Sequence, residues 1–151
     1  MESMESRMVK LYARNNNHVA LHAIPGHFAT SHSHINFYID MTSLKTRANE
    51  AQEVAKSLAG DYVNSTVVDT IVCMDGTEVV GAYLAQEFEK RGFRNTNLHN
   101  TIYVVTPEYN ANNQLIFRDN TIPAIKGKNV ILLLATTTTG LTVRRSLECV
   151  Q

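Results

Sequence analysis

Hydrophobic and polar positions alternate along the central and C-terminal parts of the chain with two different periods. Short runs of β-branched and aliphatic residues predict strands at 67–74, 101–106 and 129–135. Apolar residues at helical spacing predict helices at 42–60 and 78–90, with Gly60 and Gly92 as stop signals, and a further helix from Val143 onward. Strands that alternate with helices predict an α/β fold with a mainly parallel central sheet flanked by helices.

The N-terminal third has a different pattern. Residues 18–24 alternate between apolar and polar positions, Pro25-Gly26 is typical of a turn, and 35–41 is rich in β-forming residues. Together these segments predict antiparallel strands near the N-terminus. Residues 5–13 are expected to form a short helix that ends at the run of asparagines from Asn15.

Two further segments carry specific expectations. The apolar run at 129–135 is typical of a central parallel strand that is covered on both faces. Residues 115–117 are expected to return beside the strand at 101–106 as a hairpin, within a segment from Pro107 to Pro123 that we expect to be a mobile loop.

Length and composition restrict the class of protein. The 151 residues form a single expected domain, 1–151, and 44% hydrophobic with 19% charged residues is the balance of a protein with a packed core. Fourteen basic residues balance fourteen acidic ones, so no overall field favours nucleic acid or an anionic membrane as a partner. The longest apolar run, 130–135, is far shorter than the ~20 residues of a transmembrane helix.

Cysteine and histidine usage adds little chemistry. Cys73 and Cys149 lack the spacing of a metal knuckle or a disulfide framework, and the N-terminus lacks the apolar core of a signal peptide, so we expect a reduced, cytoplasmic setting. Five histidines lie close together in the sequence without an acidic or cysteine ligand at a diagnostic spacing, so we assign no metal site. These are His18, His22, His27, His32 and His34.

A threonine-rich turn follows the strand at 129–135 and precedes the last helix. Backbone N–H groups converge at a helix N-terminus, Gly140 permits close approach, and the hydroxyls of the turn add hydrogen-bond donors, which favours anion binding. The alternative is a threonine turn that only caps its helix. Because parallel sheets bind ligands beyond the carboxyl ends of their strands, the turns at 74–78 and 135–142 are the two candidate sites.

The segment from Val130 to Thr142, VILLLATTTTGLT, resembles the phosphoribosyl-diphosphate motif of type I phosphoribosyltransferases. That motif has a hydrophobic strand, two acidic residues and a Thr-Thr-Gly-x-Thr loop. The resemblance implies that the 5′-phosphate is bound by Thr138, Thr139, Gly140 and Thr142. Leu134 and Ala135 stand where the family has its acidic pair, so the resemblance supplies no catalytic residue.

Two other segments extend the resemblance. Residues 27–40, HFATSHSHINFYID, partly match a segment of orotate phosphoribosyltransferases at Phe28, Ser33, Asn36, Tyr38 and Asp40. Residues 72–81, VCMDGTEVVG, occupy the place of the family's pyrophosphate loop. By resemblance the backbone of Asp75, Gly76 and Thr77 would meet a diphosphate, whereas the residues alone are equally typical of a plain Asp-Gly turn.

The resemblance implies Mg²⁺ as a cofactor, a homodimer, and a chain that would be incomplete at its C-terminus. It leaves three functions open. The protein transfers phosphoribose to a nitrogenous base, as an orotate phosphoribosyltransferase does; or it binds phosphoribosyl diphosphate or a nucleotide 5′-phosphate without transfer, as a ligand-binding or regulatory protein; or it acts through subunit contacts alone. The apolar pair at Leu134 and Ala135 favours binding without ordinary catalysis.

Overall fold

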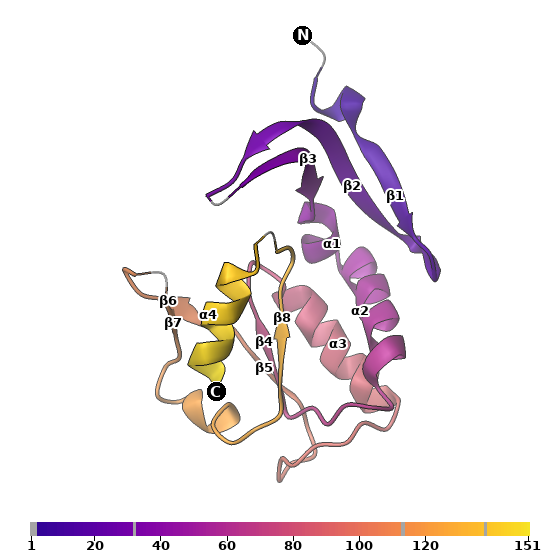
Figure 1. Cartoon of the computed structure of the whole chain (residues 1–151). Helices are drawn as coiled ribbons and strands as arrows, with labels where there is room; N and C mark the ends of the chain where they lie inside the picture. The colour runs from indigo at the N-terminus through magenta and orange to yellow at the C-terminus, as the bar shows by residue number, and fades with distance from the viewer. Residues whose placement is uncertain (1–2, 32, 113, 138) are drawn as a thin grey trace.

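The structure is a computed structural model that describes residues 3–31, 33–112, 114–137 and 139–151. It contains an antiparallel three-stranded sheet, a parallel three-stranded sheet and a two-stranded hairpin, with helices around the parallel sheet. Figure 1 shows the antiparallel sheet arching over one end of the α/β body. The predicted combination of a parallel sheet with flanking helices and N-terminal antiparallel strands is therefore present.

The antiparallel sheet has the order β1-β2-β3, formed by β1 (Val9–Ala13), β2 (Asn16–Ala29) and β3 (His34–Asp40), and it follows a short 3-10 turn, η1 (Glu5–Arg7). The predicted helix at 5–13 is wrong beyond this turn. Val9 and Leu11 pair with Ala23 and Leu21 of β2, so their apolar side chains lie on one face of a sheet. Strand pairing overrides the weak helical pattern of these residues.

The predicted turn at Pro25-Gly26 is also wrong, because both residues lie inside β2. The register between β2 and β3 shifts between Pro25 and Phe28, so a β-bulge accommodates the proline and the glycine. The chain reverses later, where the Thr30 N–H donates to the Ser33 carbonyl at 2.8 Å and the Ser33 N–H donates to Thr30 Oγ1 at 2.9 Å.

The predicted helix at 42–60 is interrupted. Arg47 has an extended conformation (φ −86°, ψ 117°) that ends α1 (Thr42–Thr46) and begins α2 (Ala48–Tyr62). α2 packs against α3 (Glu78–Lys90), and its fully buried Ala55 and Ala59 lie in one cluster with Leu84 and Phe88 of α3. Small side chains let the two helices approach closely. The bounds of α3 confirm the predicted helix at 78–90.

The parallel sheet has the order β5-β4-β8, from β5 (Tyr103–Val105), β4 (Thr70–Cys73) and β8 (Val130–Leu133). The prediction that 129–135 is a central strand is wrong for the described part of the chain, where β8 lies at an edge and is half-buried while β4 is fully buried in the centre. An apolar run reports contact on the two faces of a strand and says nothing about its edges. Figure 1 shows α2 and α3 on one side of this sheet and α4 (Leu141–Val150) on the other.

The core lies between the parallel sheet and the α2–α3 pair. Ile71 and Cys73 of β4 contact Leu84 and Phe88 of α3 in one buried cluster, with Leu133 packed against it. Burying a side chain of this size stabilises the fold by about 1.5–3 kcal/mol.

No helix in the described ranges is long and apolar enough to cross a membrane.

The segment after β5 forms its own hairpin from β6 (Glu108–Tyr109) and β7 (Leu115–Ile116), followed by a 3-10 turn, η2 (Ile122–Ala124). The predicted pairing of 115–117 with 101–106 is therefore wrong. Asn110 Oδ1 accepts hydrogen bonds from the N–H groups of Asn112 and Gln114, both at 2.9 Å, which reverses the chain directly after Tyr109. Pairing with β6 is closer along the chain than pairing with β5.

Candidate functional site

The first candidate turn follows β4, where Asp75 and Gly76 both have left-handed backbone conformations, with φ of 56° and 74°. Glycine adopts this conformation freely and aspartate more readily than most residues. The Thr77 N–H donates to the Met74 carbonyl at 3.2 Å, and the Thr77 hydroxyl lies 2.7 Å from the same oxygen and 3.2 Å from the Leu133 carbonyl. Thr77 thus joins the ends of β4 and β8.

A lysine from α1 holds the same turn from the other side. Lys45 Nζ donates a hydrogen bond of 2.8 Å to the Asp75 backbone carbonyl. This hydrogen bond from an element distant in the sequence supports the left-handed conformation of Asp75. The Asp75 side chain remains exposed.

The second candidate turn ends at Gly140, which precedes α4 with φ 78°. A β-carbon placed on Gly140 would meet no atom within 4 Å, so the backbone here faces open space. Thr142 and Ser146 lie on one side of α4, and the Ser146 hydroxyl donates to the Thr142 carbonyl at 2.7 Å. Thr138, the first residue of the predicted phosphate-binding set, lies outside the described residues.

The structure brings the two turns together around a cavity of about 160 Å³. Its walls come from the tip of the β2–β3 hairpin, from the turn after β4 and from the turn before α4. The lining residues are Ser31, Asp75, Thr136, Thr137, Thr139, Gly140, Leu141 and Thr142. Of the predicted site residues, Thr139, Gly140, Thr142 and Asp75 meet here, whereas Gly76 and Thr77 do not line the cavity.

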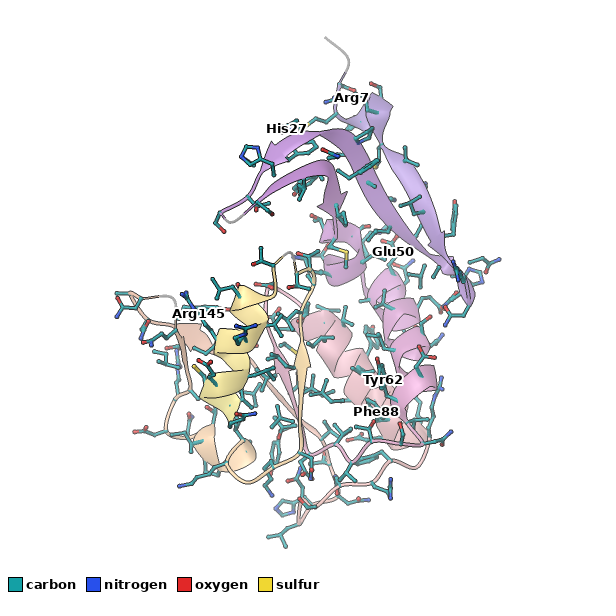
Figure 2. All side chains as sticks on the ribbon, viewed as in Figure 1. Arg7, His27, Glu50, Tyr62, Phe88 and Arg145 are labelled. Atoms are coloured by element: carbon teal, nitrogen blue, oxygen red, sulfur yellow. The ribbon has the colours of Figure 1, made fainter. Side chains whose placement is uncertain are left out.

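A second cavity, of about 440 Å³, shares Ser31, Asp75 and Thr142 with the first and adds Tyr109 and Arg145. Burial, and then the negative charge of Asp75, raise the pKa of Tyr109, so its hydroxyl stays a protonated donor at neutral pH. Figure 2 shows Arg145 on the N-terminal half of α4. Sequence reasoning missed Arg145, although three residues from Thr142 is the spacing that places two side chains on one helix face.

A third cavity, of about 950 Å³, lies between the β2–β3 hairpin and the threonine turn. Phe28 and Tyr38 line it with ring centroids 5.7 Å apart, and Thr136, Thr137 and Thr139 line both this cavity and the 160 Å³ cavity. His27 also lines this cavity, and its Nε2 lies 2.7 Å from Nδ1 of His34. In the described residues no group of three or more histidine, cysteine or acidic side chains could hold a metal ion.

Asp40 of the matched segment at 27–40 and Arg118 of the predicted loop at 107–123 have other environments. The Asp40 carboxylate accepts a 2.9 Å hydrogen bond from the Thr42 N–H, and hydrogen bonding by Thr42 lowers its pKa, so Asp40 serves the start of α1. Arg118, the base of the 107–123 segment, is paired with Glu108, its Nε donating to the carboxylate at 2.6 Å. Neither lines a cavity beside the threonine turn.

Leu134 and Ala135 line a mainly apolar cavity of about 630 Å³ against α2 and α3, which shares Thr136 and Thr137 with two of the cavities above. Its other walls include Tyr62 of α2, Phe88 of α3 and Val143 of α4. The two residues that stand at the acidic pair of the resembled motif are therefore in apolar surroundings. Asp75 is the acidic side chain that the described residues contribute to the cavities around the threonine turn.

Comparison with known proteins gives support for the fold. No family model matches the chain, and no curated protein matches its sequence. A solved structure of Mycobacterium tuberculosis H37Rv orotate phosphoribosyltransferase in complex with Fe(III) dicitrate is similar, with a TM-score of 0.52 and 12% sequence identity over 86% of this chain and 69% of that chain. This likeness shows a phosphoribosyltransferase-like α/β fold.

Proposed function

We propose that this protein binds a phosphorylated ribose, as phosphoribosyl diphosphate or a nucleoside 5′-monophosphate, between the turns at 75–77 and 138–142. The observation that carries the proposal is the 160 Å³ cavity, in which Asp75 and Thr139, Gly140 and Thr142 meet at the carboxyl ends of β4 and β8. The ends of neighbouring parallel strands are the usual ligand site of such sheets.

In this proposal the phosphate of the ligand lies at the start of α4. The positive end of the helix dipole and the free N–H groups of its first turn favour an anion, and Gly140 leaves the backbone open to it. The hydroxyls of Thr139 and Thr142 can donate to phosphate oxygens, and Arg145 supplies a positive charge one turn further along the helix.

The base is placed in the 950 Å³ cavity below the β2–β3 hairpin. Phe28 and Tyr38 offer aromatic faces on which a planar heterocycle can stack. Because Thr136, Thr137 and Thr139 line both this cavity and the 160 Å³ cavity, a single nucleotide can reach from one to the other.

The proposal favours binding over transfer. Catalysis of phosphoribosyl transfer requires charges that stabilise the departing diphosphate. Arg118, the base of the 107–123 segment, is paired with Glu108, and Leu134 and Ala135 offer no carboxylate that could hold a metal ion beside the diphosphate. We call the 160 Å³ and 440 Å³ cavities together the cleft. Among the described residues that line the cleft, Asp75 is the one acidic side chain that Mg²⁺ would meet, so the ion would be held largely by oxygens of the ligand and water.

The test is calorimetric titration of ribose 5-phosphate, phosphoribosyl diphosphate and nucleoside monophosphates into the wild type, Gly140→Ala and Gly127→Ala. Gly140 and Gly127 have φ of 78° and 71°, and a β-carbon added to either residue would meet no atom within 4 Å, so the backbone strain of the two variants is matched. Gly127 precedes β8, at the opposite end of the strand from the cleft.

We expect Gly140→Ala to weaken binding at least tenfold, because the methyl group occupies the space where the phosphate approaches the backbone. Gly127→Ala should bind as the wild type does. Equal affinities in all three proteins would refute the phosphate site. Transfer of labelled phosphoribose to any common base, measured in the same preparations with Mg²⁺, would instead favour the enzymatic alternative.

A further inference from the structure

The Asp75 carboxylate holds an unusual position in the cleft. It lines both the 160 Å³ cavity, with the threonine turn, and the 440 Å³ cavity, with Tyr109 and Arg145. Asp75 directly follows the carboxyl end of β4, so one residue is shared by a cavity of the proposed phosphate site and a cavity that the β6–β7 hairpin lines through Tyr109 and Leu115.

The backbone at Asp75 is fixed while its side chain is free. Lys45 binds the Asp75 carbonyl, and Gly76 continues the left-handed turn. The carboxylate oxygens form no hydrogen bond or ion pair with any side chain or backbone group in the described ranges. The negative charge of Asp75 nevertheless helps to raise the pKa of Tyr109. A carboxylate held in a rigid turn without a protein partner is available to a ligand.

The charge of Asp75 decides which ligand group it accepts. A second anionic group beside it would be repelled, whereas neutral hydroxyl groups can donate hydrogen bonds to its two oxygens. Adjacent hydroxyls on a sugar ring fit a carboxylate well, because one oxygen can accept from each. The phosphate of the same ligand would lie at Thr139, Gly140 and Thr142, which line the 160 Å³ cavity together with Asp75.

We infer that Asp75 binds the ribose hydroxyls and makes the site selective for ribose phosphates over 2-deoxyribose phosphates and simple phosphate. The inference rests on the proposed function. It assigns to a turn after β4 the hydroxyl recognition that Leu134 and Ala135, in their apolar cavity, cannot supply. Asp75 acts here as a specificity-determining residue through its side chain.

The experiment compares the wild type, Asp75→Asn and Glu78→Gln in titrations with ribose 5-phosphate, 2-deoxyribose 5-phosphate and inorganic phosphate. Asparagine tolerates the left-handed conformation, so Asp75→Asn removes the charge with little strain in the turn. Glu78 begins α3 three residues away and lines none of the cleft cavities, which makes Glu78→Gln a control for loss of a nearby charge.

We expect the wild type to prefer ribose 5-phosphate to the 2-deoxy sugar by about tenfold. In Asp75→Asn this preference should fall to less than about threefold, while inorganic phosphate binds as well or better because a repelling charge is gone. Glu78→Gln should keep the wild-type preference.

A preference for ribose that survives in Asp75→Asn, or a wild type that binds all phosphates without such a preference, would overturn the inference and leave the proposed phosphate site standing. A wild type that binds none of the three probes would overturn the proposed function and this inference with it. Circular dichroism of each variant checks that the change in affinity does not come from unfolding.

Discussion

Asp69 and Asn129 are joined by two hydrogen bonds, in which the backbone N–H and the Nδ2 group of Asn129 donate to Asp69 Oδ2 at 2.8 and 2.7 Å. The other carboxylate oxygen accepts from the Thr96 N–H at 2.5 Å, and Asp69 is fully buried. Asp69 directly precedes β4 and Asn129 directly precedes β8. The pair therefore aligns the amino ends of the two strands whose carboxyl ends hold the cleft.

The Asp69 carboxylate should make the free energy of unfolding depend on pH in the acidic range. Burial raises the pKa of Asp69, but hydrogen bonds from Asn129 and Thr96 outweigh burial and lower it from 3.8 to about 2. A depressed folded-state pKa stabilises the fold above the unfolded pKa, and this contribution is lost as pH falls through the folded value. We expect a loss of about 2 kcal/mol in the free energy of unfolding between about pH 4 and pH 2.

Urea denaturation of the wild type and Asp69→Asn across this pH range measures the effect. The variant should be less stable at pH 6, because an amide NH₂ group would face N–H donors, and its stability should change less on acidification. Asp61→Asn, at an exposed position of α2, serves as the control and should retain the acid dependence. An unchanged acid dependence in Asp69→Asn would contradict this role.

Gly81 of α3 lies directly against the Cys73 sulfur of β4. A β-carbon on Gly81 would overlap Cys73 Sγ, with Val104 Cγ1 at 3.4 Å as its next neighbour. We expect Gly81→Ala to lower the free energy of unfolding by about 1–3 kcal/mol through overpacking, although alanine is the better helix former. Urea denaturation at neutral pH measures this cost.

A second substitution identifies the cause. Cys73→Ala removes the sulfur, so the double variant Gly81→Ala/Cys73→Ala should lose less stability than the sum of the single variants, with a coupling of about 1 kcal/mol. Gly60→Ala in α2 has Arg91 NH1 at an ordinary 3.7 Å and should be neutral or stabilising. Additive costs in the cycle would mean that the sulfur is not the obstacle.

The sequence predicted those helices and strands whose hydrophobic periodicity is determined by their own residues. The helix at 78–90 has the predicted bounds because apolar side chains recur on one face and Gly92 follows it, and β3 lies within one residue of the predicted start at 35–41. The break at Arg47 and the edge position of β8 were not predictable in this way. Each depends on which segments pack beside the element.

The same distinction holds for the candidate site. The meeting of Asp75 with Thr139, Gly140 and Thr142 follows from a general rule about parallel strands, and was expected from the order of elements. Ser31 and Tyr109 come from hairpin segments that are far from both turns in the sequence. No local pattern marks a hairpin residue as part of a cleft, so these two became visible only in the folded chain.

Arg145 and its neighbour Arg144 offer a matched test of electrostatics in the cleft. Both side chains are exposed, but Arg145 lines the 440 Å³ cavity together with Thr142, whereas Arg144 lines none of the cavities beside the threonine turn. Both residues lie in the first half of α4, so both variants lose the same charge at nearly the same distance from the helix N-terminus.

Arg145→Gln should weaken binding of ribose 5-phosphate by about tenfold, because a hydrogen bond from a charged donor to phosphate is lost, and Arg144→Gln by no more than about twofold. Titrations at low and high salt distinguish a direct contact with the ligand from a long-range electrostatic effect. The loss of affinity in Arg145→Gln should persist at high salt, whereas the small loss in Arg144→Gln should disappear there. Equal losses in the two variants would mean that α4 attracts phosphate only through its overall charge and that Arg145 makes no contact with the ligand.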